Sequence, residues 1–276
     1  MKSRIKSVLR RIFFKTAELA GTERQSILLG EIRAAQIREF PRLRSLADAE
    51  FCIFSQWGED GIISWLVDTI QPLHRTFVEF GVEEFREANC RYLMMSRNWS
   101  GLIIDGSETN IATVKQDTIS YKYDLTSVCA FIDSDNISKI LATNGFSGPL
   151  GILSVDIDGV DYWIVEAIKS DCDIIIAEYN DLFSGRAVSV PYDKNFNRLS
   201  KHWSGMYWGA SLDAFRYLLE GRGYVFVGTN KVGTNAFFVA GRHRRLLEDR
   251  IETFVAWPCR MREVRGRDGK LALKTY

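Results

Sequence analysis

The chain has 276 residues, with 36 lysines and arginines against 35 aspartates and glutamates, so its formal net charge is +1. A charge this close to zero excludes a global field that attracts nucleic acid or an anionic surface, and any basic contact must be local. Hydrophobic residues make up 46% and charged residues 26%, as in soluble globular proteins, and no apolar run reaches the roughly 18 residues of a membrane span.

The cysteines indicate a reducing compartment. Five are present, an odd number, and none forms a Cys-x-x-Cys pair, which argues against disulfides and against a zinc site. The N-terminus lacks the apolar core and small-residue cleavage site of a secretory signal. We therefore expect a cytoplasmic protein.

Residues 1–20 predict a basic amphipathic helix. Its apolar face carries Ile5, Val8, Leu9, Ile12, Phe13 and Leu19, and its basic face carries Lys2, Arg4, Lys6, Arg10, Arg11 and Lys15. Such a helix can lie on the inner face of an anionic membrane, and its composition also suits a transit peptide or a partner groove. The alternative is a helix that packs on the domain. A second helix over residues 23–38, ended by Pro41, completes a helical extension over residues 1–50.

Residues 51–70 predict an apolar segment, a polar turn and an amphipathic helix. The turn contains Ser55, Gln56, Glu59 and Asp60. Their side-chain oxygens can satisfy the free N–H groups at the start of the helix, and residue chemistry favours this capping role. The functional alternative is that the turn borders a ligand cleft.

Four apolar runs each have an acidic residue at or near their end. They span Thr76–Gly81, Gly101–Asp105, Ile152–Gly159 and Asp173–Asn180. Segments with helical spacing separate them, which predicts an α/β fold with a doubly wound, mostly parallel sheet. In such sheets ligands bind at the carboxyl ends of the strands. The residues expected at that edge are Glu79, Asp105, Asp156, Asp158 and Glu178.

The first two strands suggest a cofactor site. Glycine at position 81 lets the backbone approach a ligand, and Glu79 can accept hydrogen bonds from it. The next residues, 82–86, lack the remaining glycines of the dinucleotide fingerprint, and their acids would repel a pyrophosphate. Asp105 follows the first acid by about 25 residues, the position from which a carboxylate holds ribose hydroxyls.

Two further polar residues have open roles. Asn89 stands near the start of the next predicted helix, where a cap is the structural alternative to a ligand contact. Asp124 ends a weak strand predicted at residues 121–124 and could contact an adenine edge, or it could start a turn.

Asp156, Asp158 and Asp161 form the densest acidic cluster of the sequence, around Gly159. Three carboxylates this close repel one another unless something neutralises them, and a divalent cation is the obvious agent. Together with Glu178 and Asn180 of the following strand, Asp156 and Asp158 could hold Mg²⁺ or Mn²⁺. The alternative is that these residues bind the cofactor and cap helices, a role for which Asp161 is best placed.

The C-terminal third adds a binding loop, a hairpin and a tail. Residues 183–208 interleave aromatic and polar side chains, which suits sugar rings, and include His202, a candidate general base or else a structural histidine. Two short strands around residues 230–233 predict an antiparallel hairpin that closes the sheet. We expect one domain over residues 51–258, followed by a solvated basic tail over residues 259–276.

The order of these motifs resembles class I S-adenosylmethionine-dependent methyltransferases, and more closely the FkbM-type methyltransferases and their relatives from bacterial polysaccharide loci. The segments that carry the resemblance are Ser55–Gly61, Phe77–Gly81, Ser154–Trp163, Glu178–Asn180 and Gly233–Val239. The resemblance implies a Rossmann-like fold. The sequence differs from the family pattern at residues 82–86, where bulkier, acidic residues stand in place of a glycine-containing loop.

The resemblance also implies a cofactor and a reaction. S-adenosylmethionine would lie against Glu79 and Gly81 at its methionine end, Asp105 at its ribose and Asp124 near its adenine, with Gln56, Glu59 and Asn89 bordering the cleft. The methyl group would pass to a sugar hydroxyl of a glycan or nucleotide-sugar intermediate, with Asp156, Asp158 and His202 as catalytic candidates. The alternatives are a non-catalytic scaffold in glycan assembly, which the altered loop favours, and a metal-dependent hydrolase that uses the Asp-rich strand ends.

Overall fold

The computed structural model describes residues 21–259, 264–268 and 270–272. The basic helix expected at residues 1–20 lies outside this range. Within the described residues, no helix has both the length and the apolar character needed to cross a membrane.

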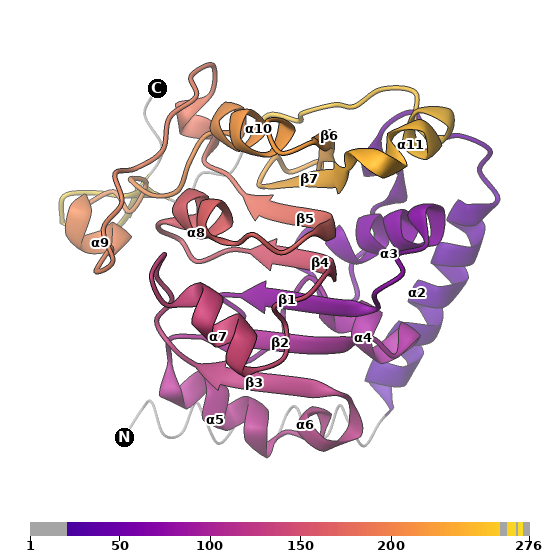
Figure 1. The fold of residues 1–276 in the computed structure, drawn as a ribbon, viewed down its shortest axis with the longest axis horizontal. Helices are drawn as coiled ribbons and strands as arrows, with labels where there is room; N and C mark the ends of the chain where they lie inside the picture. The colour runs from indigo at the N-terminus through magenta and orange to yellow at the C-terminus, as the bar shows by residue number, and fades with distance from the viewer. Residues whose placement is uncertain (1–20, 260–263, 269, 273–276) are drawn as a thin grey trace.

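Seven strands form one sheet in the order β3-β2-β1-β4-β5-β7-β6 (Figure 1). Strands β1 to β5 pair in parallel, and β7 runs antiparallel to both β5 and β6. Their bounds are β1 Thr76–Phe80, β2 Ser100–Asp105, β3 Leu125–Cys129, β4 Leu150–Val155, β5 Cys172–Glu178, β6 Tyr224–Thr229 and β7 Asn235–Ala240. The predicted doubly wound sheet with a terminal antiparallel hairpin is confirmed, and its strand order reverses between β1 and β4, where such sheets bind ligands.

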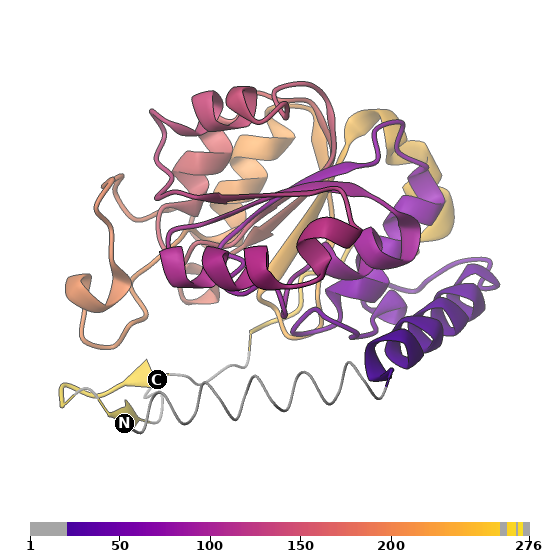
Figure 2. The same ribbon diagram turned by 90° about the horizontal axis from the view of Figure 1, so that it is seen from below.

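Helices cover both faces of the sheet (Figure 2). One face packs on α3 Glu59–Ile70, α4 Arg91–Arg97, α5 Glu108–Gln116, α6 Ile119–Lys122 and α11 Arg244–Arg250. The other face packs on α7 Ile137–Thr143, α8 Asp161–Ala167 and α10 Leu212–Glu220. Outside these layers lie α2 Thr22–Arg38, α9 Arg198–Lys201, the 3₁₀ turns η1 Leu46–Ala49, η2 Asp181–Phe183 and η3 Gly241–His243, and the small ladder β8 Val264–Arg265 with β9 Leu271–Ala272.

The strands alternate their side chains between two hydrophobic cores. Phe77 of β1 enters the core beneath α3 and α4, whereas Val78 and Phe80 enter the core beneath α7 and α8. All six residues of β4 are buried, as expected for a strand covered on both faces. By the same alternation, Glu79 of β1, Glu178 of β5 and Asn235 of β7 all lie on the α3 side of the sheet.

One predicted strand is wrong. Residues 119–122 form α6, and the third strand begins at Leu125. The helix is favoured because the Asp117 side chain accepts the N–H of Ile119 and the Asp117 carbonyl accepts that of Ser120. Asp124 therefore precedes β3 and lies at the amino edge of the sheet, opposite the edge that carries Asp105.

Truncation of a fully buried strand residue tests this core. Phe77 is 0% exposed, so Phe77→Ala should lower the free energy of unfolding by about 3–5 kcal/mol because it leaves a cavity. Urea denaturation would measure the change. Leu73, which is 88% exposed, provides the control, and Leu73→Ala should leave stability nearly unchanged. Equal effects of the two substitutions would contradict this packing.

Candidate active site at the carboxyl edge of the sheet

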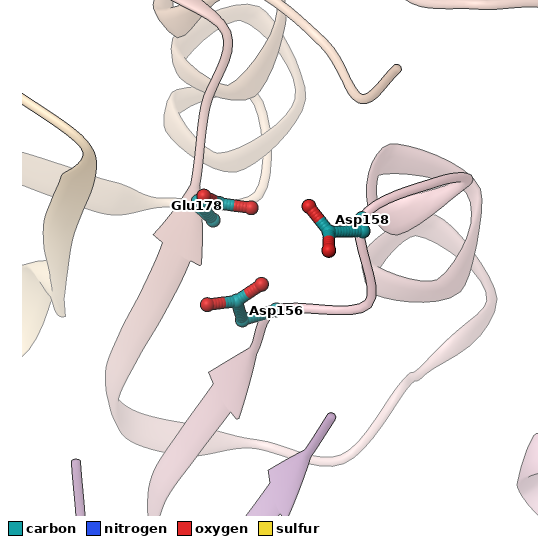
Figure 3. Close-up of side chains that lie close together, drawn as sticks. All are labelled: Asp156, Asp158 and Glu178. Carbon is teal, nitrogen blue, oxygen red and sulfur yellow. The ribbon is translucent and has the colours of Figure 1, made fainter. Parts of the chain in front are cut away.

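Three carboxylates meet where β4 and β5 end. Asp156 follows β4, Glu178 is the last residue of β5, and Asp158 faces both from the turn before α8 (Figure 3). One oxygen from each residue lies within 4.8 Å of the others. The sequence prediction that these three residues gather at one edge is confirmed.

The turn between β4 and α8 is held in shape by Asp161. Its buried carboxylate accepts the N–H of Ile157 at 2.8 Å and the N–H of Gly159 at 3.0 Å. This stabilises a left-handed backbone at Asp158, whose φ is 55°. Asp161 thus fixes the turn that precedes α8, and Asp158 points back toward Asp156 and Glu178 (Figure 3).

A close backbone contact joins this turn to the end of β1. A Cβ atom built on Gly81 would lie 1.6 Å from the carbonyl oxygen of Asp156, and Gly81 has φ 71°. Both facts require glycine at this position. The first glycine of the predicted cofactor loop therefore has a structural reason to be glycine, independent of any ligand.

Burial changes the protonation of the acidic cluster. It raises the pKa of Asp156 to about 7, against the opposing effect of a proton shared with Glu178, and the charge of Asp158 raises it further. Burial and the charge of Asp156 together raise the pKa of Glu178 well above its usual value. Both side chains are only partly exposed at the base of the cleft. These raised pKa values disfavour ionisation of both carboxyls at once near neutral pH.

A basic residue from a distant loop reaches the same cluster. Arg198 forms an ion pair with Asp158, 40 residues away in sequence. The segment that carries Arg198 is fastened at several points: Asn180 donates to the carbonyls of Met206 and Trp208, and Trp163 Nε1 donates to the carbonyl of Val190. Residues 181–211 therefore form a hydrogen-bonded loop segment, called the wall below, beside Asp158 and Glu178.

A cavity of about 130 Å³ opens between this wall and Glu178. Its lining combines apolar surface from Leu182, Leu199, Met206 and Trp208 with the charged groups of Glu178, Asp181, Arg198 and Arg265. A volume of this order accommodates one small ring.

The described part of the C-terminal tail completes that cavity. Cys259 lines it and donates its N–H to Asp181 Oδ2 at 3.2 Å, and Arg265 lines it from β8. The Arg265 N–H also donates to the carbonyl of Ser204. The expectation of a fully solvated tail does not hold for these residues.

The predicted cofactor residues on β1 and α4 contact one another. Glu79 is 4% exposed, and its two carboxylate oxygens accept the N–H groups of Asn89 at 2.6 Å and Cys90 at 3.0 Å, just before α4. Burial raises the pKa of Glu79 to about 7. Asn89 Nδ2 donates to Ser154 Oγ of β4. Glu79 therefore orders the start of α4.

Asp105 lies at the end of β2, as predicted, and is surrounded by donors. Its Oδ2 accepts the N–H of Glu83, and its Oδ1 accepts the N–H of Ser107 and the side chain of Asn110. An ionised carboxylate has about four acceptor positions, so one remains for a ligand hydroxyl. Phe131, which is 83% exposed, lies against Gly106 and offers an aromatic face beside Asp105.

The polar turn before α3 is mainly structural. Asp60 Oδ2 accepts the N–H groups of three residues, Ile53, Phe54 and Ser55, and Ser55 Oγ accepts the N–H of Asp60. The capping interpretation therefore holds for Ser55, which accepts an N–H of the first turn of α3, whereas Asp60 orders the segment that precedes the helix. Glu59 is fully buried and accepts hydrogen bonds from Asn230 and Asn235 of the hairpin, whereas Gln56 is exposed beside them.

Three other predicted site residues are placed differently. Asp124 lies at the opposite edge of the sheet, so its prediction as an adenine contact is wrong. The Asn180 side chain accepts the N–H of Leu182 through its oxygen and donates to the carbonyl of Met206 through its nitrogen. The candidate metal ligands that cluster are therefore the three carboxylates Asp156, Asp158 and Glu178. His202 is exposed, contacts Ser204 and Trp203, and does not line the cavity.

No family model matches the chain, and no curated protein does. The plantazolicin methyltransferase BpumL in complex with SAH is 12% identical with a TM-score of 0.44, covering 84% of this chain and 100% of that one. A S-adenosylmethionine-dependent methyltransferase from Clostridium acetobutylicum is 10% identical with a TM-score of 0.40, covering 66% and 90%. TehB from Haemophilus influenzae is 12% identical with a TM-score of 0.39, covering 63% of this chain and 61% of TehB, less than two thirds of its length.

The fold is Rossmann-like. This assignment rests on the chain's own sheet, with five parallel strands, reversal between β1 and β4, and an antiparallel β7 inserted between β5 and β6. At TM-scores of 0.39–0.44 and identities of 10–12%, the likeness to these solved structures adds nothing to that assignment. Activity and substrate therefore have to be argued from the site.

Sequence reasoning missed several residues of this site. Arg198, Arg265 and Phe131 reach the edge from loops and the tail, and no local pattern marks them. Asn235 did carry a signal, because it opens the strand that follows the predicted hairpin turn. Its partner Glu59 is 176 residues away in sequence, which explains why the contact itself was not predicted.

The acidic cluster should make stability depend on pH. Asp156 ionises near pH 4 in the unfolded chain but near pH 7 in the fold. Between these pH values the folded state binds more protons than the unfolded state, so the free energy of unfolding decreases as the pH rises from about 4 to 7. Asp156→Asn should therefore raise the stability at pH 8 by roughly 2 kcal/mol and leave it nearly unchanged at pH 4. Thermal unfolding at both pH values measures this.

Asp124→Asn is the control for that experiment, because Asp124 is an exposed aspartate at the other edge. It should shift the melting temperature by the same small amount at both pH values. A loss of stability in Asp156→Asn that is equal at pH 4 and pH 8 would contradict the shared proton.

Proposed function

We propose that this protein is an S-adenosylmethionine-dependent O-methyltransferase. The observation that carries the proposal is the arrangement of one sheet edge. Asp105 and the Gly81 turn lie on one side of the strand-order reversal, and the Asp156–Glu178 pair lies on the other, beside a cavity. A donor on the first side and an acceptor on the second would meet at the switch point, where doubly wound sheets bind ligands.

The residues present fit the cofactor in part. Asp105 keeps one acceptor position for a ribose hydroxyl, and Phe131 provides a face for a flat ring, whereas the space beside Gly81 is filled by the carbonyl of Asp156. Glu79 would act indirectly, because its carboxylate is occupied by the start of α4. When bound, S-adenosylmethionine would supply an electrophilic methyl group.

The Asp156–Glu178 pair would serve as the base. Near pH 7 one carboxyl of the pair holds a proton and the other does not, so the pair can accept the proton of an acceptor hydroxyl as its oxygen forms the new bond to carbon. Arg198 neutralises Asp158 and so keeps the third charge from opposing that transfer. If Mg²⁺ or Mn²⁺ takes part, Asp156, Asp158 and Glu178 are the residues that would hold it.

The acceptor we propose is a sugar hydroxyl of a glycan or nucleotide-sugar intermediate. The cavity has the size of one small ring, and Trp208 and Met206 offer apolar surface while Asp181 and Arg198 offer polar groups. Sugars combine these two requirements, because their rings stack on aromatic faces and their hydroxyls bind polar neighbours.

Calorimetry with S-adenosylmethionine and S-adenosylhomocysteine tests the cofactor. We expect micromolar binding that Asp105→Ala weakens about 10- to 100-fold, because a hydrogen bond to a charged group is lost. Asp124→Ala is the matched control, an aspartate at the opposite edge, and should bind like the wild type. Absence of binding at millimolar cofactor would overturn the proposal. It would favour a non-catalytic scaffold, an alternative that the contact between Asp105 and the Glu83 N–H already supports.

Transfer of a radiolabelled methyl group to a panel of nucleotide sugars and oligosaccharides tests the base. Asp156→Asn should lower kcat by about 10²–10⁴-fold while the affinity for the cofactor is retained, as expected for loss of a general base. His202→Ala separates the two candidate bases and should change kcat little. A large loss in His202→Ala with an active Asp156→Asn would reverse the assignment. Assays with EDTA and with added Mg²⁺ show whether a metal is needed.

A further inference from the structure

Helix α2 presents an uncharged apolar stripe to solvent. Leu28, Leu29 and Ile32 are 56%, 63% and 48% exposed. At 100° per residue they lie on the side of the helix opposite to Gly30, Ala34 and Ile37, which are buried. The remaining outward positions between residues 25 and 36 are Gln25, Ala35 and Gln36, so this side carries no charge over three turns.

The orientation of α2 is fixed by its buried side. A Cβ atom on Gly30 would lie 2.8 Å from the Tyr92 ring and 3.0 Å from Ile53, so the helix is seated closely on the domain. Arg91 adds an ion pair to Glu23, and Arg38 adds one to Asp68. Figure 2 shows α2, in indigo, as an outlying helix beside the main body. The stripe therefore cannot be buried by a small rotation of the helix.

We propose that this stripe docks on an anionic lipid surface. The second observation is the sequence that precedes it: residues 1–20 contain six lysines and arginines and one acid, Glu18. An apolar stripe in a chain that also carries a basic segment is a combination that binds anionic bilayers, because apolar side chains insert between the headgroups and basic ones contact them. This proposal does not depend on the methyl donor.

Charge favours lipid over the other occupants. Helix α2 has three basic residues, Arg24, Arg33 and Arg38, and two acidic ones, Glu23 and Glu31, and a third acid, Glu39, follows at its C-cap. Residues 1–20 carry a net positive charge, so the same segments of two copies repel each other, and this segment gains no electrostatic attraction from α2, whose own charges do not sum to a negative value. An anionic bilayer is the occupant that satisfies both the stripe and the segment.

Vesicle sedimentation of the full chain tests the proposal. The probes are phosphatidylcholine vesicles with and without phosphatidylglycerol. We expect binding to the anionic vesicles alone, weakened by salt because surface charge is screened. The triple substitution Leu28→Gln, Leu29→Gln and Ile32→Gln should weaken that binding about tenfold or more. Glutamine suits the test because it favours helix nearly as well as leucine does.

The matched control replaces two exposed hydrophobic residues on other surfaces. Leu73 and Tyr217 are 88% and 77% exposed, so Leu73→Gln with Tyr217→Gln removes apolar surface away from α2 and should bind vesicles like the wild type. Thermal unfolding should show that both variants keep the wild-type stability. If the α2 variant loses stability, the single substitution Leu29→Gln takes its place, with a proportionate loss of binding expected.

Three results would overturn the proposal. The wild type could fail to bind anionic vesicles, or the α2 variant could bind them as tightly as the wild type. Sedimentation velocity without lipid provides the third: a wild-type dimer that the α2 substitutions convert to a monomer would assign the stripe to a second copy of this chain.

Discussion

The site depends on the contact between the ends of β1 and β4. The carbonyl of Asp156 occupies the space that a side chain at position 81 would need, so the β1 turn and the β4 turn can meet only if residue 81 is glycine. This contact fixes where the chain leaves β4. From that point the backbone, held by Asp161, directs Asp158 back over Asp156 and brings both to Glu178. A substitution at Gly81 would therefore displace the acids as well as the turn that precedes α4.

The acidic residues of this edge are stabilised in different ways, and the differences separate structural from chemical roles. Glu79, Asp60 and Asp161 accept backbone N–H groups, so each fixes a turn or a helix start. Glu178 Oε2 and Asp60 Oδ1 are both buried with no hydrogen-bond partner among the described residues, but Glu178 also lies beside a second carboxyl group, that of Asp156. A shared proton is what allows it to lie beside Asp156. A carboxyl pair that exchanges a proton near neutral pH is suited to proton transfer, whereas a carboxylate held by backbone amides is not.

The sequence predicted the parts of the fold that local patterns determine. Apolar runs that end in acids located β1, β2, β4 and β5, and the turn at residues 230–233 located the hairpin, because burial on both faces and turn chemistry are visible in short windows. Asp124 was misplaced because the alternation in Tyr121–Asp124 resembles a strand, and only the hydrogen bonds of Asp117 favour the helix. Arg198 could not be predicted, since its meeting with Asp158 depends on how a long loop crosses the finished sheet.

The loop after β1 shows how bulky residues are stabilised in a left-handed backbone conformation. Glu83 and Phe85 have φ values of 48° and 54°, left-handed conformations that cost free energy in residues other than glycine. Phe85 offsets this cost by full burial, with its ring stacked on Phe77 at 6.4 Å, and its carbonyl accepts a hydrogen bond from Arg91. The same conformation directs the N–H of Glu83 to Asp105. The bulky acidic loop is thus an ordered part of the sheet edge, and its backbone occupies one of the acceptor positions of Asp105.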